Sequence, residues 1–337
     1  MLKVAAYTSG RNIPSARFRL RQYIPALSRL GVEVREHCAR FGSSPPCWKA
    51  LRPLWGAAAV GDRIVSSAGS FLADLTLLQK EMVSTFVTAE PLTRRPRVLD
   101  VDDAIWLRRH GTAARRLAGL CELVICGNEY LADHFRNWNT NVRILPTAVD
   151  TDRYVPVSGP SSEIKRIGWS GESSNFRYLD PILPAVLAVL EKRKDVIFRV
   201  VSEQRPRIDG IAPERIEFIR WSPENEVRVI QEMSVGIMPL HDTAWARGKC
   251  SFKLLTYMAC GIPVVASPVG MNASVLAAGG GFGPISWDEW GGALDCLLDD
   301  EAAARQMSIQ GRDTVVRGYG LRALAPRLAE ILRSCRN

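Results

Sequence analysis

The sequence predicts an α/β protein built from two doubly wound, parallel-sheet domains that face a cleft. Three observations lead to this prediction. The chain has 337 residues, more than one ordinary hydrophobic core accommodates and a suitable length for two domains. Short runs rich in valine and isoleucine alternate with longer amphipathic stretches in both halves, as in parallel sheets covered by helices. A segment without periodicity separates the halves.

In the first half, the apolar runs predict strands, and the amphipathic stretches between several of them predict helices. The predicted strands are Lys3–Tyr7, Glu33–His37, Arg63–Val65, Arg97–Val101, Leu123–Cys126 and Arg143–Leu145. The predicted helices are Ala16–Leu30, Phe71–Ala89 and Glu129–Trp138.

The second half repeats the theme. Its predicted strands are Arg166–Trp169, Ile197–Val201, Ile216–Ile219, Val235–Met238 and Pro263–Ser267. Its predicted helices are Tyr178–Lys192, Glu224–Met233, Ser251–Ala259 and Trp287–Leu298, and an amphipathic helix over Leu321–Arg333 closes the chain. Each half therefore has the strand–helix alternation of a Rossmann-like domain.

The stretch Leu145–Lys165 reads LPTAVDTDRYVPVSGPSSEIK and mixes prolines with hydroxyl residues without a period. Such a composition is typical of an interdomain linker. We therefore expect an N-terminal domain over residues 1–155, a C-terminal domain over residues 156–318 and a final helix within residues 319–337.

The positive charge is concentrated in the first half. The chain carries a formal net charge of +9, and residues 1–155 hold 22 Lys and Arg against 14 Asp and Glu, a net +8. That half should attract an anionic partner, such as a membrane surface or a phosphate-bearing substrate. No recognisable nucleic-acid-binding motif occurs, so we expect no nucleic-acid partner. The alternative explanation for this charge is that the arginines only solubilise the surface and bind no partner.

The eight cysteines are scattered, with no CxxC and no histidine at zinc spacing. We therefore expect no metal site and buried, free thiols. The first residues, MLKVAAYTSGRN, resemble a strand more than a signal peptide, and no apolar stretch approaches the ~20 residues that cross a bilayer. A cytoplasmic location follows as an expectation.

The run RGKCSFKLLTYMACGIPVVASPVG places Arg247, Lys249 and Lys253 around the predicted start of a helix, with Ser251 as its N-cap. A cation there costs on the order of 0.3–1 kcal/mol when nothing compensates. A bound anion reverses that sign, since free backbone N–H groups and ammonium groups then converge on it. A diphosphate fits the charge. The alternative is a pair of solvated lysines beside a capped helix.

Two further loops follow strands of the second half, where an open parallel sheet binds its ligands. The loop PLHDTAW offers His241 and Asp242, which could contact sugar hydroxyls. The loop GWSGESSNF contains Gly168 and Gly171, which would let a backbone approach a ligand, although ordinary turns contain glycines too.

In the first half, VLDVDDAIW ends a strand with Asp102 and Asp103. Adjacent carboxylates repel each other, and they could orient a hydroxyl, act as a base or bind Mg²⁺. Capping the next helix is the alternative for one of them. The loop SGRNIPSARFRLRQ adds Arg17, Arg19 and Arg21, of which 17 and 21 would share a helix face, so at most two should serve one anion. The sequence is equally consistent with these arginines lying on a solvated surface.

These stretches together resemble the family 4 (group 1) glycosyltransferases, which have the GT-B fold. KCSFKLLTYMACGIPVVASPVG resembles their nucleotide-sugar segment, and PSARFRLRQYIPALSRLGVEV resembles their first loop and helix. Three further stretches resemble segments of the family and occur in the same order along the chain. They are CELVICGNEYLADHF, VRILPTAVDTDRYVP and IEFIRWSPENEVRVIQEMSVGIMPL. The resemblance covers most of the chain and is strongest from Ile216 to Asn272.

The resemblance implies transfer of a sugar from a nucleotide-diphosphate donor to a hydroxyl of a glycan or lipid-linked acceptor, with retention and without an obligatory metal or other cofactor. The donor would be a UDP-, GDP- or dTDP-sugar. We expect catalytic roles for Asp102, Asp103 and Lys253, with Lys253 on the diphosphate and Lys249 and Arg247 in support.

The donor would further contact residues of the second half and the basic run. These are Gly168, Ser170, Gly171, Glu172, Trp221, Ser222, His241, Asp242, Ser251, Phe252, Thr256, Gly270 and Asn272. Trp221 and Ser222 would lie near the base. Ser15, Arg17 and Arg21 would lie on the acceptor side. A lipid-linked acceptor would bring the protein to the inner face of an anionic membrane as a peripheral protein.

Two departures from the family pattern keep alternatives open. Members commonly carry a pair of Glu residues where this chain has Gly248 and Thr256, and their Gly-Arg loop is replaced by GWSGESSNF. An isomerase of the nucleotide-sugar 2-epimerase type would share the fold and the donor site. A non-catalytic protein that binds a nucleotide sugar is the other alternative, and the missing Glu pair favours it.

Overall fold

The computed structural model describes residues 1–11, 13–42, 44–157 and 163–335. Contacts divide the chain into two compact units. The first comprises Met1–Ala148, Arg247–Cys250 and Leu321–Asn337, and the second comprises Val149–Ala246 and Ser251–Gly320. Part of the predicted linker (158–162) and the end of the predicted final segment (336–337) lie outside the described residues.

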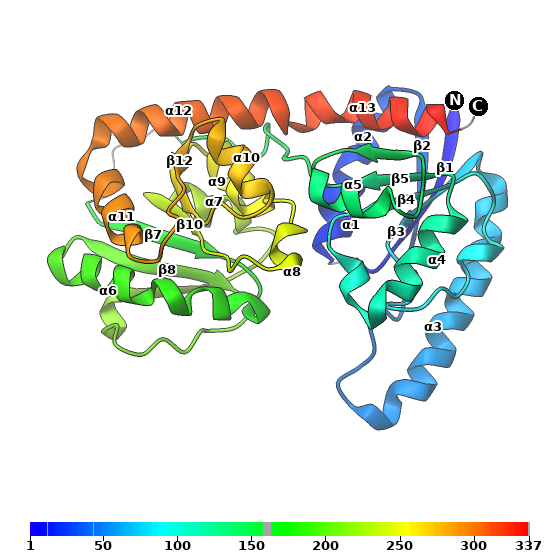
Figure 1. The fold of residues 1–337 in the computed structure, drawn as a ribbon, viewed down its shortest axis with the longest axis horizontal. Helices are drawn as coiled ribbons and strands as arrows, with labels where there is room; N and C mark the ends of the chain where they lie inside the picture. Colours follow the sequence, from blue (N-terminus) through cyan, green and yellow to red (C-terminus); the bar gives the residue numbers. More distant parts are fainter. Residues whose placement is uncertain (12, 43, 158–162, 336–337) are drawn as a thin grey trace. The chain divides into compact units, whose positions relative to one another are not determined.

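The first unit is a six-stranded sheet in the order β2-β1-β3-β4-β5-β6 (Figure 1). All of its pairings are parallel. Its strands are β1 (Leu2–Thr8), β2 (Val32–Cys38), β3 (Leu75–Gln79), β4 (Arg97–Val101), β5 (Leu123–Cys126) and β6 (Val142–Ile144). Its α-helices are α1 (Pro14–Arg19), α2 (Ile24–Arg29), α3 (Arg52–Ser67), α4 (Thr112–Leu120), α5 (Glu129–Phe135) and α13 (Leu321–Ser334).

The final helix α13 completes the core of this first unit. Leu324, Leu328 and Leu332 recur at four-residue spacing and are buried against the same cluster as Val4 and Leu27. The amphipathic pattern of this segment is therefore explained by packing within the first unit.

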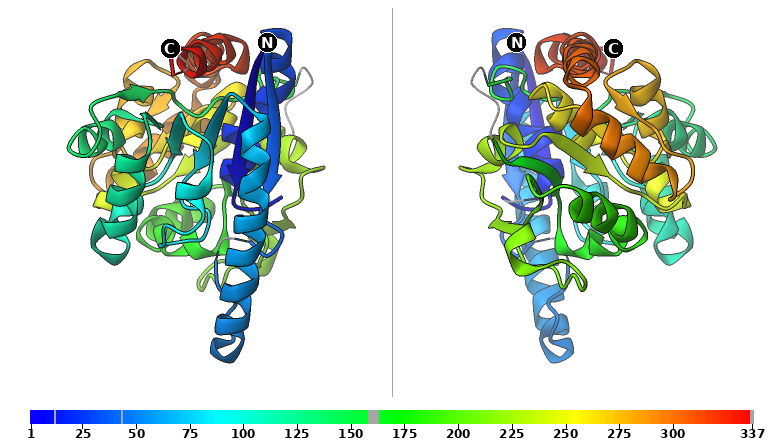
Figure 2. Two further views of the ribbon diagram at one scale, coloured as in Figure 1. Left: turned by 90° about the vertical axis from the view of Figure 1, so that its right-hand side faces the viewer. Right: turned by 90° about the vertical axis from the view of Figure 1, so that its left-hand side faces the viewer.

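The second unit is also a six-stranded parallel sheet, in the order β12-β11-β10-β7-β8-β9. Its strands are β7 (Lys165–Ser170), β8 (Val196–Ser202), β9 (Ile216–Arg220), β10 (Val235–Met238), β11 (Val264–Ala266) and β12 (Gly281–Phe282). Its α-helices are α6 (Leu183–Lys192), α7 (Glu226–Gln231), α8 (Ala244–Arg247), α9 (Phe252–Ala259), α10 (Met271–Ala277), α11 (Glu289–Asp299) and α12 (Glu301–Gly318). Further views are given in Figure 2.

Each sheet has a point where the direction of strand addition reverses. In the first unit β1 pairs with β2 on one side and β3 on the other, and in the second unit β7 lies between β8 and β10. Ligands of open parallel sheets bind beyond the carboxyl ends of strands at such switch points. The loops after β1, β3, β7 and β10 are therefore the places to look for function.

The α/β class is confirmed, but two predicted elements are wrong. The predicted strand Arg63–Val65 lies inside α3, and the predicted helix Phe71–Ala89 contains β3. All residues of β3, LTLLQ, are buried, so the segment lacks the alternation that marks a half-exposed strand. In α3 the buried residues recur at helical spacing (Ala59, Arg63 and Ser67), whereas Val65 is exposed.

Among the described residues, no helix combines the length and the apolar character that crossing a bilayer requires. All eight cysteines are free; Cys47 is exposed, contrary to the expectation of buried thiols. The described part of the chain contains no cluster of three His, Cys, Asp or Glu side chains arranged to hold a metal ion.

Candidate active site

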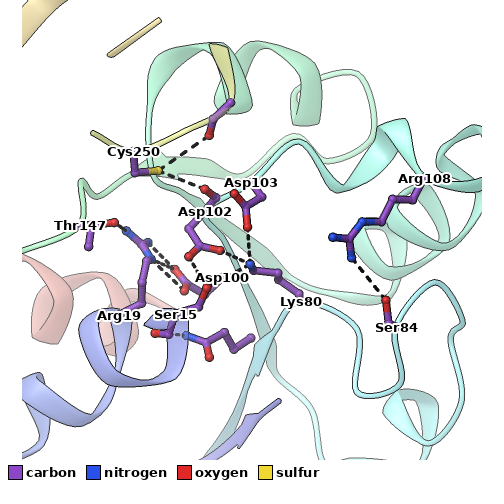
Figure 3. A network of polar contacts seen from close by, with 12 residues as sticks. Ser15, Arg19, Lys80, Ser84, Asp100, Asp102, Asp103, Arg108, Thr147 and Cys250 are labelled. Carbon is purple, nitrogen blue, oxygen red and sulfur yellow. Dashed lines mark hydrogen bonds and ion pairs between the residues drawn. The ribbon is translucent and has the colours of Figure 1, made fainter. Parts of the chain in front are cut away.

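A compact ionic cluster lies at the carboxyl end of the first sheet. Asp102 and Asp103 follow β4, and Lys80 follows the neighbouring strand β3. The Lys80 ammonium lies 2.6 Å from an Asp102 carboxylate oxygen and 2.7 Å from one of Asp103 (Figure 3). One cation thus offsets the repulsion between the two adjacent carboxylates.

Ser15, in the first turn of α1, joins the same cluster. Its hydroxyl donates to Asp102 Oδ2 at 2.5 Å, and it accepts from Lys80 Nζ at 3.1 Å. The side-chain amide of Gln79 donates to the Ser15 carbonyl at 2.9 Å and so holds the start of α1 against β3. The structure therefore brings Ser15 together with Asp102 and Asp103, three residues that the sequence analysis singled out.

This environment keeps Asp102 ionised. Burial raises the pKa of Asp102, but the charges of Lys80 and Arg19, with hydrogen bonds from Lys80 and Ser15, outweigh burial and hold that pKa below its usual value. Burial lowers the pKa of Lys80, whereas the two carboxylates raise it by more. Asp102 is therefore a stable anion and a weak proton acceptor at neutral pH.

Arg19, from the arginine-rich segment, forms a buried ion pair within the first unit. Arg19 is buried, its Nε lies 3.1 and 3.0 Å from the two Asp100 carboxylate oxygens, and its Nη1 donates to the Leu145 carbonyl at 2.8 Å. Asp100 is the residue of β4 two positions before Asp102. This buried pair supports the cluster from within the sheet. Sequence reasoning missed Lys80 and Asp100, and it named Arg19 only as part of a basic loop.

Arg17 and Arg21 do not share a helix face, because α1 ends at Arg19 and a separate 3₁₀ turn begins at Arg21. Arg21 donates to both carboxylate oxygens of Glu36 at 2.7 and 2.8 Å, and hydrogen bonding to Glu36 is the main cause of its raised pKa. Arg17 is half-buried, with its guanidinium 4.6 Å from the Phe18 ring centroid.

The basic run is divided between the units. Arg247–Cys250 belongs to the first unit, where Asn128 Nδ2 donates to the carbonyls of Arg247 and Lys249 at 3.3 and 3.0 Å. The Cys250 thiol lies 3.3 Å from the Asp102 carbonyl.

A side chain at Gly248 would not fit this packing. A Cβ there would come within 2.8–2.9 Å of Ala104 atoms, one of them backbone. The tight packing against Ala104 leaves no room for the carboxylate side chain that the resemblance implies at this position.

In the second unit, Lys253 meets the glycine loop that follows β7. Its ammonium lies 4.5 Å from the centroid of the Trp169 ring, a cation–π contact. A Cβ at Gly171 would collide with that ammonium and come within 2.7 Å of Trp169, so only glycine leaves room for Lys253 here. The Ser170 amide donates to the Tyr257 hydroxyl at 2.8 Å, which fastens α9 to the end of β7.

Ser251 lies at the start of α9 but does not cap it. Ser251 has a left-handed backbone (φ 52°), and its buried hydroxyl donates to Asn272 Oδ1 at 2.6 Å. Asn272 in turn donates to the Ser267 carbonyl at 3.1 Å, so both predicted donor contacts hold loops together in this structure. The Thr256 hydroxyl donates back to the Lys253 carbonyl at 2.8 Å.

Several other predicted donor residues have structural partners. Gly168 lies inside β7, where Met233 fills the space a side chain would need. Gly270 has φ 56° and directly precedes the first residue of α10, Met271. Ser222 and Asn225 exchange hydrogen bonds at the start of α7, and the Trp221 amide donates to the Ser202 carbonyl at 2.9 Å, which extends the ladder past β9.

The remaining predicted residues are accessible. Glu172, His241 and Asp242 are exposed, Phe252 is half-buried, and the His241 ring lies 5.9 Å from Tyr178 and 5.5 Å from Trp287. The loop after Glu172 is held by the Glu203 carboxylate, which accepts from the Ser173 amide at 3.0 Å. Burial opposes ionisation of Glu203, but these hydrogen bonds lower its pKa overall.

Residues 164–300, in the unit that carries Lys253 and the glycine loop, match the family described as glycosyl transferases group 1. The matched segment makes up less than half of the chain, and over that segment it confirms the resemblance seen in the sequence. A search of curated protein sequences gave no match.

Solved structures of low sequence identity share the fold of the chain. Sucrose-phosphate synthase from Thermosynechococcus elongatus superposes with a TM-score of 0.71 at 15% identity, covering 99% of both chains. HepE from Anabaena, solved with UDP and glucose, gives 0.72 at 14% identity over 99% of this chain and 100% of its own. WaaG, a glycosyltransferase involved in lipopolysaccharide biosynthesis, gives 0.67 at 14% identity over 97% and 99%. These similarities identify the architecture as GT-B.

Proposed function

We propose that the protein transfers a sugar from a nucleotide-diphosphate donor to a hydroxyl of a glycan or lipid-linked acceptor, with retention of configuration. No metal or other cofactor is required in this scheme. The observation that carries the proposal is the placement of Lys253 in the first turn of α9, beside a glycine that leaves room for its ammonium.

The proposed chemistry is electrostatic. As the bond between the sugar and the diphosphate breaks, negative charge accumulates on the leaving group. Lys253 and the first amides of α9 would stabilise that charge without reorganisation, an effect commonly worth about 3–4 kcal/mol per well-placed donor. We assign Arg247 and Lys249 a supporting role on the same anion, which mutation of each must test separately.

The rest of the donor would contact loops of the second unit. We assign the phosphates to Ser170, Gly171 and Glu172, the base to Trp221 and Ser222, and the sugar hydroxyls to His241 and Asp242. Gly168, Ser251, Thr256, Gly270 and Asn272 would act by shaping these loops, since each is packed or hydrogen-bonded within the unit. Phe252 would close the edge of the site.

On the acceptor side we assign Ser15, Asp102, Asp103 and Arg17. The lowered pKa of Asp102 makes it a poor base, so we propose that it positions the attacking hydroxyl and stabilises positive charge on the sugar. We assign both Arg17 and Arg21 to the acceptor side, and Arg21 is also paired with Glu36.

The donor nucleotide is proposed by analogy. HepE was solved with UDP and glucose, so UDP-glucose is the first donor to test, ahead of GDP- and dTDP-sugars. The basic first half suits an acceptor carried on a lipid diphosphate, with the protein in the cytoplasm and peripheral at an anionic membrane face.

Incubation with a panel of radiolabelled UDP-, GDP- and dTDP-sugars tests the proposal. Donor hydrolysis, or transfer to an added acceptor, supports a transferase, and the anomeric configuration of the product decides retention. An epimeric donor would instead indicate the isomerase. Tight binding of a donor without turnover would indicate the non-catalytic binding protein.

A further inference from the structure

The start of helix α3 presents large apolar side chains to solvent. Trp48 is 76% exposed, Leu51 47% and Leu54 72%. Trp48 directly precedes a 3₁₀ turn (Lys49–Leu51), Leu51 ends that turn, and Leu54 lies in the first turn of α3, so the three exposed side chains fall within seven consecutive residues. Contiguous exposed apolar side chains of this size mark an interaction site more often than isolated ones do.

This apolar segment is well anchored. The Trp55 indole donates to the Phe41 carbonyl at 2.9 Å, and Arg52 Nε donates to the Pro46 carbonyl at 3.1 Å. The buried residues of α3 are Ala59, Arg63 and Ser67, all in the second part of the helix. The beginning of α3 therefore extends past the sheet of its own unit, as Figures 1 and 2 show.

The charge around these apolar residues has a single sign. Between Glu36 and Asp62 the sequence contains no Asp or Glu, whereas Arg40, Lys49 and Arg52 all fall there. Lys49 and Arg52 alternate with the exposed apolar side chains. A tryptophan and leucines flanked by cations are typical of a helix that lies in the interface of an anionic bilayer.

We propose that Trp48, Lys49, Leu51, Arg52 and Leu54, hereafter the α3 tip, insert into the interface of a membrane containing anionic lipid. The apolar side chains would enter the boundary between headgroups and acyl chains, and the cations would contact lipid phosphates. A second copy of the chain fits less well, because docking two tips would bring like charges together. Nucleic acid fits less well because it offers no apolar surface for Leu51 and Leu54.

This inference rests on the proposed peripheral membrane contact and names the surface that makes it. It is tested by co-sedimentation of the full chain with vesicles of phosphatidylcholine alone, or of equal parts phosphatidylcholine and phosphatidylglycerol. We expect binding to the anionic vesicles only, weakened by added salt. The double variants W48S/L54S and K49Q/R52Q should each lower the partition coefficient by roughly ten-fold or more.

Val65→Ser is the matched control, because Val65 is 78% exposed on the same helix but lies outside the tip. It should bind vesicles as the wild type does. The proposal is overturned if the wild type ignores anionic vesicles, or if Val65→Ser loses as much binding as the tip variants. It is also overturned if the tip variants dissociate a dimer seen in lipid-free buffer, since a second copy would then be the occupant. Donor binding measured without lipid would be unaffected, so failure here is distinct from failure of the proposed glycosyl transfer.

Discussion

Lys80 Nζ lies 2.6 Å from Asp102 and 2.7 Å from Asp103, so a single ammonium connects the ends of two neighbouring strands. The backbone reinforces this arrangement: Lys80 has a left-handed φ of 57°, and its amide donates to the Asp100 carbonyl at 3.1 Å. Lys80 is therefore a positioning residue for the carboxylates proposed to face the acceptor.

Lys80→Met should raise the pKa of Asp102, because burial favours the neutral acid and would then meet fewer opposing charges. The acid limb of the kcat/KM profile, measured with the donor found in the panel, should move to higher pH. Lys80→Arg keeps the positive charge, so its acid limb should lie between those of the wild type and Lys80→Met. If Lys80→Met is less stable than the wild type but its acid limb does not move, Lys80 has only a structural role.

Asp102 should make folding stability depend on pH in the acid range. Its pKa in the folded protein lies below the ordinary value of about 3.9, so its contribution is present above roughly pH 4 and is lost as the pH falls through the folded pKa. Urea unfolding should show Asp102→Asn less stable than the wild type by about 1–3 kcal/mol at neutral pH, with the difference shrinking progressively as the pH falls below about 4.

Asp133→Asn is the control for that measurement, since the Asp133 carboxylate is exposed in its pair with Arg136. Its unfolding free energy should follow that of the wild type at each pH. A gap between Asp102→Asn and the wild type that persists unchanged at low pH would contradict an ionised Asp102.

Lys253→Ala should weaken donor binding by about 10- to 100-fold, the effect expected for loss of a charge-assisted contact. The melting temperature should change less than donor affinity, since the cation–π contact with Trp169 is worth only about 0.5–1 kcal/mol. Lys192→Ala, which removes an exposed lysine of the same unit paired with Asp295, is the control for charge. Equal donor affinity in the wild type and Lys253→Ala, measured by calorimetry, would place the diphosphate elsewhere.

Gly171→Ala tests the same site without removing a charge. The added methyl group would occupy the position of the Lys253 ammonium and press on Trp169, so Lys253 must move. We expect donor affinity to fall by about ten-fold, with a destabilisation of about 1–2 kcal/mol from the contact with Trp169. Gly292→Ala adds a methyl group to α11 where nothing lies within 4 Å, and it should leave donor affinity unchanged.

Local patterns could predict the residues that lie next to a strand end or a helix start. The run Arg97–Val101 predicted a strand. The two aspartates that follow it were therefore expected at the carboxyl edge of a sheet. Lys253 was proposed in the same way, because a cation in the first turn of a helix is unfavourable without an anion, and the structure places it in the first turn of α9. The prediction that Ser251 caps the helix was wrong, since its hydroxyl donates instead to Asn272, 21 positions away.

The sequence by itself determined the α/β class, the parallel sheets and the positions of Asp102, Asp103 and Lys253, because periodicity and helix-end charge are properties of neighbouring residues. Only the tertiary structure decided that Lys80 neutralises the aspartates, that Arg19 is buried against Asp100, and that Arg247–Cys250 belongs to the first unit. The physical reason is that these contacts depend on strand order: β3 lies between β1 and β4, so residues 15, 80 and 102 meet although the chain separates them widely.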